Sequence, residues 1–262
     1  MKKLNFCFST KLTFDNYVRE HSFALRCIPP ESAAQHILSC ELDIVPFVST
    51  KQTVDAFGNN VITGYLKGEH RFLDFEVKGC AEIDSTAQKR DYMPCYLYQS
   101  AYTKPDAALK EFHHRISMTC AEREPYSRAL CFCEALSQLM TYDKQATDTK
   151  TTAAKAFELK RGVCQDYTHI LLSVLRLDGI ACRYIAGLAS CDGETHAWVE
   201  VWDGSCWRGI DPTNNCTVND EYLILSQGRD FGDCAVDRGV MFGAYTKQLQ
   251  LITSTLSANG YY

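Results

Sequence analysis

Alternation of apolar and polar residues dominates the first third of the chain and predicts strands. Apolar side chains recur at every second position in most of 4–14, and again in 38–44 and 73–77. Between the last two segments, Asp55-Ala-Phe-Gly-Asn-Asn60 is typical of a tight turn. Several alternating strands joined by turns predict an N-terminal β-sandwich over residues 1–95.

After residue 95 the apolar period becomes that of a helix, and later returns to that of strands. The remainder, 96–262, is therefore predicted to be a second, α+β domain. The predicted helices cover 105–116, 128–142, 153–160 and 164–177. The predicted strands cover 196–202, 206–210, 222–225 and an alternating segment at 240–251, and the first two flank an Asp-Gly hairpin turn.

Three chemically reactive residue types stand at the ends of these predicted elements. Cys164 opens a helix just after Gly162, where the positive end of the helix dipole favours a thiolate. His196 begins a strand, and Asp211 ends the next strand of the hairpin, so the hairpin can bring the two together. A nucleophilic thiol needs a base, and the base needs a third group to orient it. We therefore predict a Cys164–His196–Asp211 catalytic triad.

Each member of the triad has a simpler explanation when taken alone. A single buried cysteine is usually a small apolar residue, a single histidine on a strand is often a core residue, and Asp-Pro is often only a turn. The combination of the three, each at the end of an element, favours catalysis over these explanations.

Composition restricts the possible partners. The 262 residues include 46% hydrophobic and 23% charged residues, which is ordinary for a globular chain. A net charge of -5 without a basic patch argues against a nucleic-acid partner. No secretory signal and no apolar run long enough to span a membrane are apparent. The 14 cysteines are therefore interpreted as mostly reduced thiols, and we expect a cytoplasmic protein without a membrane partner.

Metal and cofactor binding are not expected. The chain has no Cys-x-x-Cys pair, and Cys131 and Cys133 point apart on a predicted helix. The adjacent residues His113 and His114 diverge in the same way. No loop carries regularly spaced carboxylates of the kind that bind calcium.

Five ordered strings resemble the transglutaminase-like superfamily of papain-type cysteine enzymes, and more closely its bacterial candidate cysteine proteases. They are Gly162-Val-Cys-Gln-Asp166, Arg183-Tyr-Ile-Ala-Gly187, His196-Ala-Trp-Val-Glu200, Asp211-Pro-Thr-Asn214 and Gly228-Arg-Asp-Phe-Gly-Asp233. The resemblance extends to the N-terminal β-domain of that family, so it covers most of the chain. One departure is Val236, where these proteins often carry proline.

The resemblance implies a papain-like fold, in which the helix carrying the cysteine packs on an antiparallel sheet. It also implies that Cys164 is the nucleophile, His196 the general base and acid, and Asp211 the orienting carboxylate. Calcium, which animal transglutaminases use, does not carry over. Tyr142 and Gln165 are candidates for contact with the oxyanion, and Trp198 is a candidate shield for the thiolate–imidazolium pair. Core packing is an equal explanation for Trp198, and a structural role is favoured for Asp166, in the first turn.

Three functions stay open at this point. The first is hydrolysis of peptide or isopeptide amides through a thioester intermediate, which ranks highest. The second is a transglutaminase that passes the acyl group to an amine, and the third is a binding or scaffold module without activity. Because the triad serves both enzymes, it does not decide between them. The expected partner is a peptide or protein substrate, and the oligomeric state is not readable from the sequence.

Overall fold

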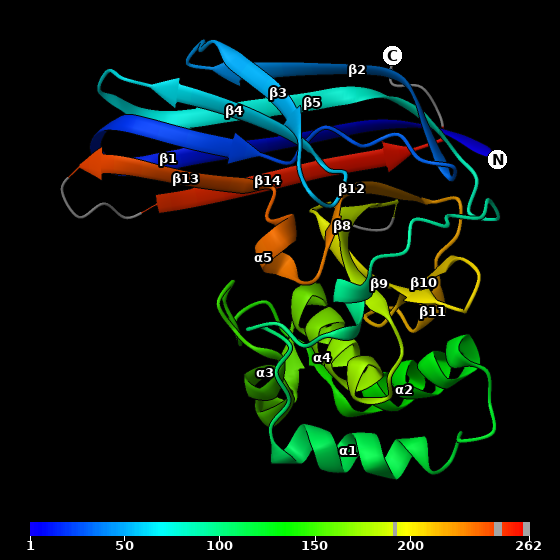
Figure 1. The fold of residues 1–262 in the computed structure, drawn as a ribbon. Helices are drawn as coiled ribbons and strands as arrows, with labels where there is room; N and C mark the ends of the chain where they lie inside the picture. The colour runs from blue at the N-terminus through cyan, green and yellow to red at the C-terminus, as the bar shows by residue number, and fades with distance from the viewer. Residues whose placement is uncertain (191–192, 244–247, 259–262) are drawn as a thin grey trace.

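The computed structural model describes residues 1–190, 193–243 and 248–258. A body of long strands lies above a core of helices and shorter strands (Figure 1). In chain order the elements are β1 (Lys2–Leu25), β2 (Gln35–Val45), β3 (Thr50–Val54), β4 (Asn60–Leu66), β5 (His70–Ile83), a 3-10 helix η1 (Pro94–Leu97), α1 (Ala107–Ser117), α2 (Pro125–Leu139), β6 (Thr141–Tyr142), α3 (Ala153–Leu159), β7 (Arg161–Gly162), α4 (Cys164–Leu177), β8 (Cys182–Ala189), β9 (His196–Trp202), β10 (Trp207–Asp211), β11 (Cys216–Thr217), β12 (Tyr222–Gly228), α5 (Phe231–Cys234), β13 (Asp237–Gly243) and β14 (Gln248–Ser257).

The long strand β1 organises the β-rich body. Its first half pairs with β5 and β14, and its second half pairs with β4 and β13, all antiparallel. The register shifts between Thr13 and Val18, where β1 passes from one group of strands to the other. The pairing is therefore continuous through β1, in the order β2-β5-β1-β4-β3 with β13 and β14 added to β1.

The last two strands pair with a strand from the range predicted as the first domain. Residues 237–243 and 248–257 fall in the range assigned to the second domain, yet they pair with β1 and belong to the β-rich body. The segment predicted to alternate, 240–251, has its described parts in two strands, and residues 244–247 lie outside the described residues. The pattern could not indicate the partner β1, because pairing over more than 200 residues leaves no local signal. The remaining boundary at residue 95 stays a prediction.

The alternating residues of β1 place apolar side chains on one buried face of the strand, as the sequence predicts. Leu4, Phe6, Phe8, Leu12 and Phe14 are all buried, while most residues between them are partly or fully exposed. The same apolar cluster includes three leucines from the core sheet, namely Leu188, Leu223 and Leu225. The buried face of the β-rich body thus packs directly on β8 and β12.

The core is mixed α+β. Its sheet has the order β11-β10-β9-β8-β12, and every pairing is antiparallel. Helix α4 contributes Ile170, Leu171, Val174 and Leu175 to one apolar cluster with β8, β9 and the other helices. The helix that begins at Cys164 therefore packs on an antiparallel sheet, as the resemblance implies.

Two side-chain amides fasten the β-rich body to the outer edge of β12. Gln35 accepts from the Ile224 N–H (2.8 Å) and donates to the Ile224 carbonyl (3.0 Å). Asn59 makes the same pair of bonds with Gln227, at 2.7 and 2.8 Å. These amides satisfy backbone groups that an edge strand would otherwise leave unpaired.

Charged residues hold the segment before η1 on the core sheet. Arg183 on β8 is buried and lies between Glu200 of β9 (2.7 Å) and Asp91 (2.5 Å). Lys89 also pairs with Glu200. Arg183, part of one of the strings that resemble the family, therefore has a structural role in docking this segment.

Four smaller findings concern the start of α1, the cysteines, the length of the helices and the grouping of metal-ligand side chains. Asp106 caps helix α1, because its carboxylate accepts a hydrogen bond from the Leu109 N–H. Pro105 therefore lies before the helix and not in its first turn, where the sequence predicted it. Every cysteine that the structure describes is a free thiol. Within the described residues, no helix is long and apolar enough to cross a bilayer, and no three His, Cys, Asp or Glu side chains are grouped as metal ligands.

Candidate active site

The start of α4 positions Cys164. Val163 caps the helix, and Cys164 is the first helical residue. The Asp166 carboxylate accepts hydrogen bonds from the Val163 N–H (2.8 Å) and from the Thr147 hydroxyl (2.6 Å). A side chain at Gly162 would collide with that carboxyl group, so glycine is required there. Asp166 thus fixes the turn that presents the thiol, which is the structural role that the sequence favours.

The environment of Asp166 is apolar enough to affect its ionisation. Burial raises the pKa of the Asp166 carboxyl, and the hydrogen bonds from Thr147 and Val163 oppose that shift. A helix N-terminus favours a negative charge, and the two hydrogen bonds hold the Asp166 carboxylate in place there.

The β9–β10 hairpin brings His196 to Asp211, as the sequence predicts. The two strands pair antiparallel, with Ile210 opposite Val199. His196 Nε2 lies 2.7 Å from Asp211 Oδ2, and both side chains are almost entirely buried.

Asp211 is the best-supported side chain of the site. Its Oδ1 accepts from the N–H groups of Thr213 (2.9 Å) and Asn214 (3.1 Å). Its Oδ2 accepts from His196, from the Asn214 amide (2.8 Å) and from the Tyr222 hydroxyl (2.9 Å). Burial favours the neutral acid, yet the hydrogen bonds from His196 and Asn214 lower the pKa of Asp211 below its usual value.

The ionised state of Asp211 decides the tautomer of His196. A carboxylate only accepts hydrogen bonds, so Nε2 of His196 carries the proton that joins them. The other ring nitrogen, Nδ1, is then the one that can take a proton from a thiol. This is the division of roles that a cysteine–histidine–carboxylate triad needs.

Two supports of Asp211 were not singled out from the sequence. Asn214 ends one of the strings that resemble the family, so that string held a signal. Tyr222 showed only as the start of a strand. Burial and the Asp211 charge raise the pKa of Tyr222, so its hydroxyl stays protonated and donates. No local pattern distinguishes this tyrosine from a core residue, because its partner lies on another strand.

Replacing Tyr222 by phenylalanine tests this support. Tyr222→Phe removes one of the bonds to Asp211 and leaves the others, so we expect kcat/KM to fall by about tenfold and stability by about 1 kcal/mol. Steady-state kinetics and thermal unfolding measure the two effects. An exposed tyrosine changed in the same way, Tyr98→Phe, is the control. Unchanged kinetics would show that the hydroxyl does not help to orient the carboxylate.

Trp198 lies beside the His196–Asp211 pair. Its ring is fully buried, 6.2 Å from the His196 ring and inclined by 26°, and 5.3 Å from the Tyr222 ring. The indole occupies the space that a side chain at Gly187 would need, so Gly187 on the neighbouring strand is fixed as glycine. Trp198 thus packs against the pair from one side, and its role as a shield from water stays a prediction.

Cys164 and His196 line one cleft, whose volume is about 380 Å³. Gln165 and Tyr142, the two oxyanion candidates, line the same cleft, so all of these side chains come together. Gln165 donates weakly to the Thr149 carbonyl (3.4 Å), and Tyr142 lies on β6 beside Gly162 of β7. Which of them contacts an oxyanion stays a prediction.

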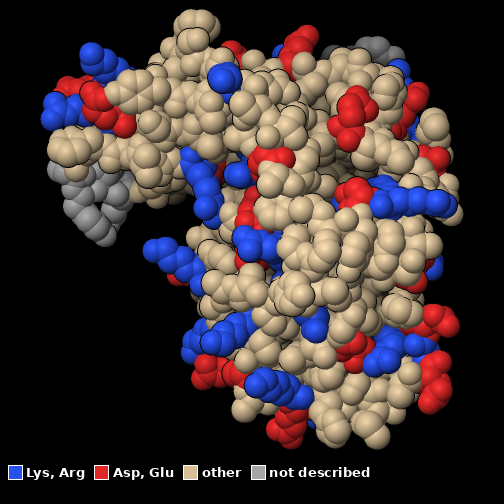
Figure 2. Space-filling view, viewed as in Figure 1, with Lys and Arg blue, Asp and Glu red and all other residues tan. Residues whose placement is uncertain are grey.

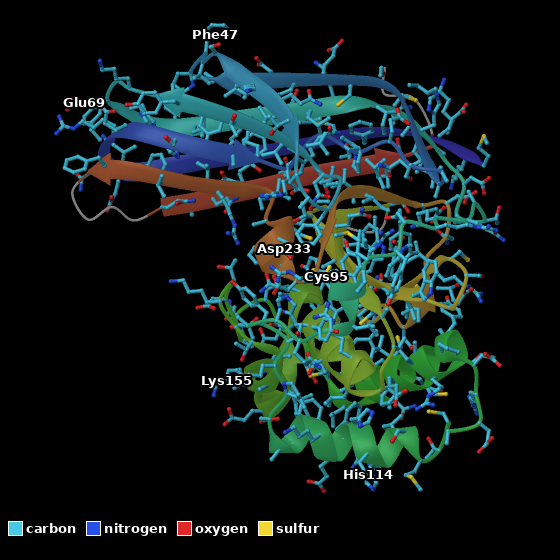
Figure 3. All side chains as sticks on the ribbon, in the orientation of Figure 1. Phe47, Glu69, Cys95, His114, Lys155 and Asp233 are labelled. Atoms are coloured by element: carbon cyan, nitrogen blue, oxygen red, sulfur yellow. The ribbon has the colours of Figure 1, made fainter. Side chains whose placement is uncertain are left out.

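The walls of the cleft come from both bodies of the protein. Lys144 and Thr149 belong to the polar segment before α3, and Gln250 and Ile252 belong to β14. Figure 2 shows a notch between the two bodies, bordered by side chains of both charges. Asp233, on α5, lies where the bodies meet (Figure 3) and pairs with Arg229 at 2.8 Å. The β-rich body therefore takes part in forming the site.

Comparison with known proteins agrees with this architecture. Residues 114–212 match the family described as the transglutaminase-like superfamily, and residues 4–82 match the bacterial transglutaminase-like N-terminal region. A crystal structure of a candidate cysteine protease from Cytophaga hutchinsonii superposes with a TM-score of 0.77. That comparison covers 100% of this chain and 93% of the other at 18% identity, so it shows the fold alone.

Relatives in mycobacteria are uncharacterized. A protein of Mycobacterium leprae is 24% identical over 251 residues, covering 87% of this chain and 88% of the relative. A protein of Mycobacterium bovis is 30% identical over 118 residues, covering 39% of this chain and 38% of its own length. The two matched regions, the shared fold and the cysteine at the head of α4 agree with one another. Residues 114–212 therefore match a transglutaminase-like core, and residues 4–82 match the bacterial transglutaminase-like N-terminal region, in one chain.

Proposed function

We propose that the protein is a cysteine-dependent acyl-transfer enzyme that hydrolyses peptide or isopeptide amides. The observation that carries this proposal is the arrangement of His196. Its Nε2 is fixed on an ionised, fully supported Asp211, and its ring lines the same cleft as Cys164 at the start of α4. A general base with an assigned tautomer in the same cleft as a helix-terminal thiol is suited to nucleophilic catalysis.

The reaction follows from these roles. The Cys164 thiol gives its proton to His196 Nδ1, and the thiolate attacks the amide carbonyl, forming a carbon–sulfur bond and an oxyanion. The imidazolium then returns the proton to the leaving amine as the carbon–nitrogen bond breaks and a thioester remains. Water, deprotonated by His196, attacks the thioester and releases the acid and the free thiol.

The oxyanion needs donors close to Cys164. The first N–H groups of a helix have no partner within the helix, so the Cys164 N–H is the natural first donor. We propose Tyr142 or Gln165 as the second, because both line the cleft. Loss of one such donor typically lowers kcat by about 10²–10³-fold, so substitution of the two residues in turn separates them.

Transfer to an amine is the second candidate, because it shares every step up to the thioester. The two outcomes differ only in the acceptor that the cleft admits. Hydrolysis ranks first because water needs no binding site of its own in the cleft, whereas an amine acceptor must be bound in preference to water. A scaffold function without catalysis is the third hypothesis. It would be favoured if Cys164 and His196 proved not to act together.

Trapping the thioester tests the proposal. The protein is incubated with a panel of fluorogenic peptide amides and a glutamine-containing peptide, quenched in acid, and digested for mass spectrometry. An acyl group on Cys164 is expected in wild type and absent in Cys164→Ala. Repeating the reaction with cadaverine present separates the outcomes, because amide product with the amine indicates transfer and free acid indicates hydrolysis. No acyl group on Cys164 with any peptide would contradict both.

A further inference from the structure

Asp237 is a carboxylate in a position where the strand pattern calls for an apolar residue. It is the first residue of β13 and pairs with Leu25, which is completely buried. Residues opposite each other on neighbouring strands project to the same face, so the Asp237 side chain is on the buried face. The next two positions on that face are Gly239, packed on His21, and Met241, packed on the apolar cluster.

The Asp237 carboxylate also borders the catalytic cleft. It lines the space that Cys164 and His196 line, together with Val236 and Lys144. The chain departs from the family pattern at this place, since Val236 stands where proline is frequent.

One oxygen of the Asp237 carboxylate lacks a partner within the described residues. Its Oδ1 is inaccessible to solvent and has no hydrogen-bond partner there. Burial raises the pKa of Asp237 to about 6, and no described cation forms an ion pair with it. A carboxylate with one buried oxygen that has no partner is unfavourable, and a cation brought into the cleft would relieve that cost.

The other charges that line the cleft compensate each other. Lys144 and Glu194 form an ion pair of 3.1 Å across the mouth. Among the described residues lining the cleft, Asp237 is then the acidic group without an opposite charge.

We propose that Asp237 is a specificity-determining residue that binds a cationic group of the substrate, an ammonium or guanidinium, beside the carbonyl that Cys164 attacks. The proposal rests on the proposed function, since it assigns a substrate class to the same cleft. The cation can belong to a basic side chain of the acyl donor or to an amine acceptor, and the chemistry of recognition is the same for both.

Charged thiol reagents test the proposal without a known substrate. Three methanethiosulfonates are used, carrying a 2-aminoethyl, a methyl or a 2-sulfonatoethyl group. The Cys164 thiolate attacks the sulfenyl sulfur, a mixed disulfide forms, and methanesulfinate leaves. The rate at Cys164 is followed by peptide mapping, because 13 other cysteines are present. The ratio of the cationic to the anionic rate cancels differences in thiol reactivity.

We expect Asp237→Asn to lower that ratio by about tenfold or more, the size of a charge interaction in a partly desolvated cleft. Glu158→Gln removes the same charge from the exposed face of α3 and is expected to leave the ratio unchanged. The neutral reagent and the melting temperature report on folding. Because burial disfavours the Asp237 charge, Asp237→Asn should be at least as stable as wild type at pH 8.

The outcomes separate this inference from the proposed function. The inference is overturned if the ratio of cationic to anionic labelling rates is the same in wild type and Asp237→Asn while Cys164 still reacts with the neutral reagent. That result leaves the proposed enzyme function intact. If no reagent labels Cys164 faster than the other thiols, the proposed function itself fails.

Peptides identify the source of the cation. If it is in the acyl donor, lysyl amides are favoured over their norleucyl analogues, and Asp237→Asn removes the preference. If it is the acceptor, Asp237→Asn instead raises the KM for cadaverine. A variant that changes neither value contradicts the proposal.

Discussion

Cys164→Ala and His196→Ala are each expected to lower kcat by about 10⁶-fold, and the double variant is expected to lose little more. The reason is that the thiol and the imidazole act as one unit. Without the base the thiol keeps its proton, and without the thiol the base has nothing to activate, so either loss removes the whole pathway. The measurement is kcat for the two single variants and the double variant, on the peptide amide that acylates wild type.

Matched substitutions elsewhere control for general damage. Cys131 lies on α2 and His114 on α1, where Figure 3 shows it at the far side of the helical body from the cleft. Cys131→Ala and His114→Ala should keep wild-type activity. If the losses in Cys164→Ala and His196→Ala instead multiplied in the double variant, the two residues would be acting independently and the couple would not exist.

Asp211→Asn is expected to lower kcat by about 10⁴-fold, the loss seen when a triad carboxylate becomes an amide in serine proteases. Asp211 holds the proton on His196 Nε2 and so leaves Nδ1 as the base. An asparagine can present its NH₂ group to Nε2, which favours the opposite tautomer. The variant should also retain the fold, because the backbone N–H groups of Thr213 and Asn214 can still donate to the remaining amide oxygen. The measurement is the pH profile of kcat in wild type and variant.

Asp211 should also make stability depend on pH. Its pKa is lower in the folded protein than in the unfolded chain, so it stabilises the fold above the unfolded pKa, and that contribution is lost as pH falls through the folded pKa. Asp211→Asn should therefore lose part of the acid dependence of unfolding. Asp203→Asn, in the hairpin turn, is the control for kcat. Near-normal kcat in Asp211→Asn would show that the carboxylate does not orient His196.

The sequence was a good guide where the signal is local. The helix at 164–177 has the limits that its apolar spacing and the Asp178-Gly179 stop predict. The hairpin around Asp203-Gly204 forms as expected and brings His196 to Asp211. The same holds for the N-terminal alternation, because burial of one face follows directly from a period of two.

The sequence was a poor guide where partners are distant. The described parts of the predicted segment 240–251 lie in β13 and β14, and their pairing with β1 depends on the whole fold. Tyr222 supports Asp211 only because β12 and β10 belong to one sheet. Asp237 is an ordinary exposed acid by sequence, and only the pairing with Leu25 places its carboxylate on a buried face beside the cleft.

The central claim is that Cys164 and His196 form a couple in the free protein. The most direct test is alkylation of Cys164 by iodoacetamide from pH 5 to 9, located by mass spectrometry in wild type and in His196→Ala. We predict that Cys164 reacts faster than the other thiols at low pH, and that the advantage is lost in His196→Ala. Alkylation of Cys164 no faster than its neighbours, and equal in the variant, would contradict the account and favour a binding module.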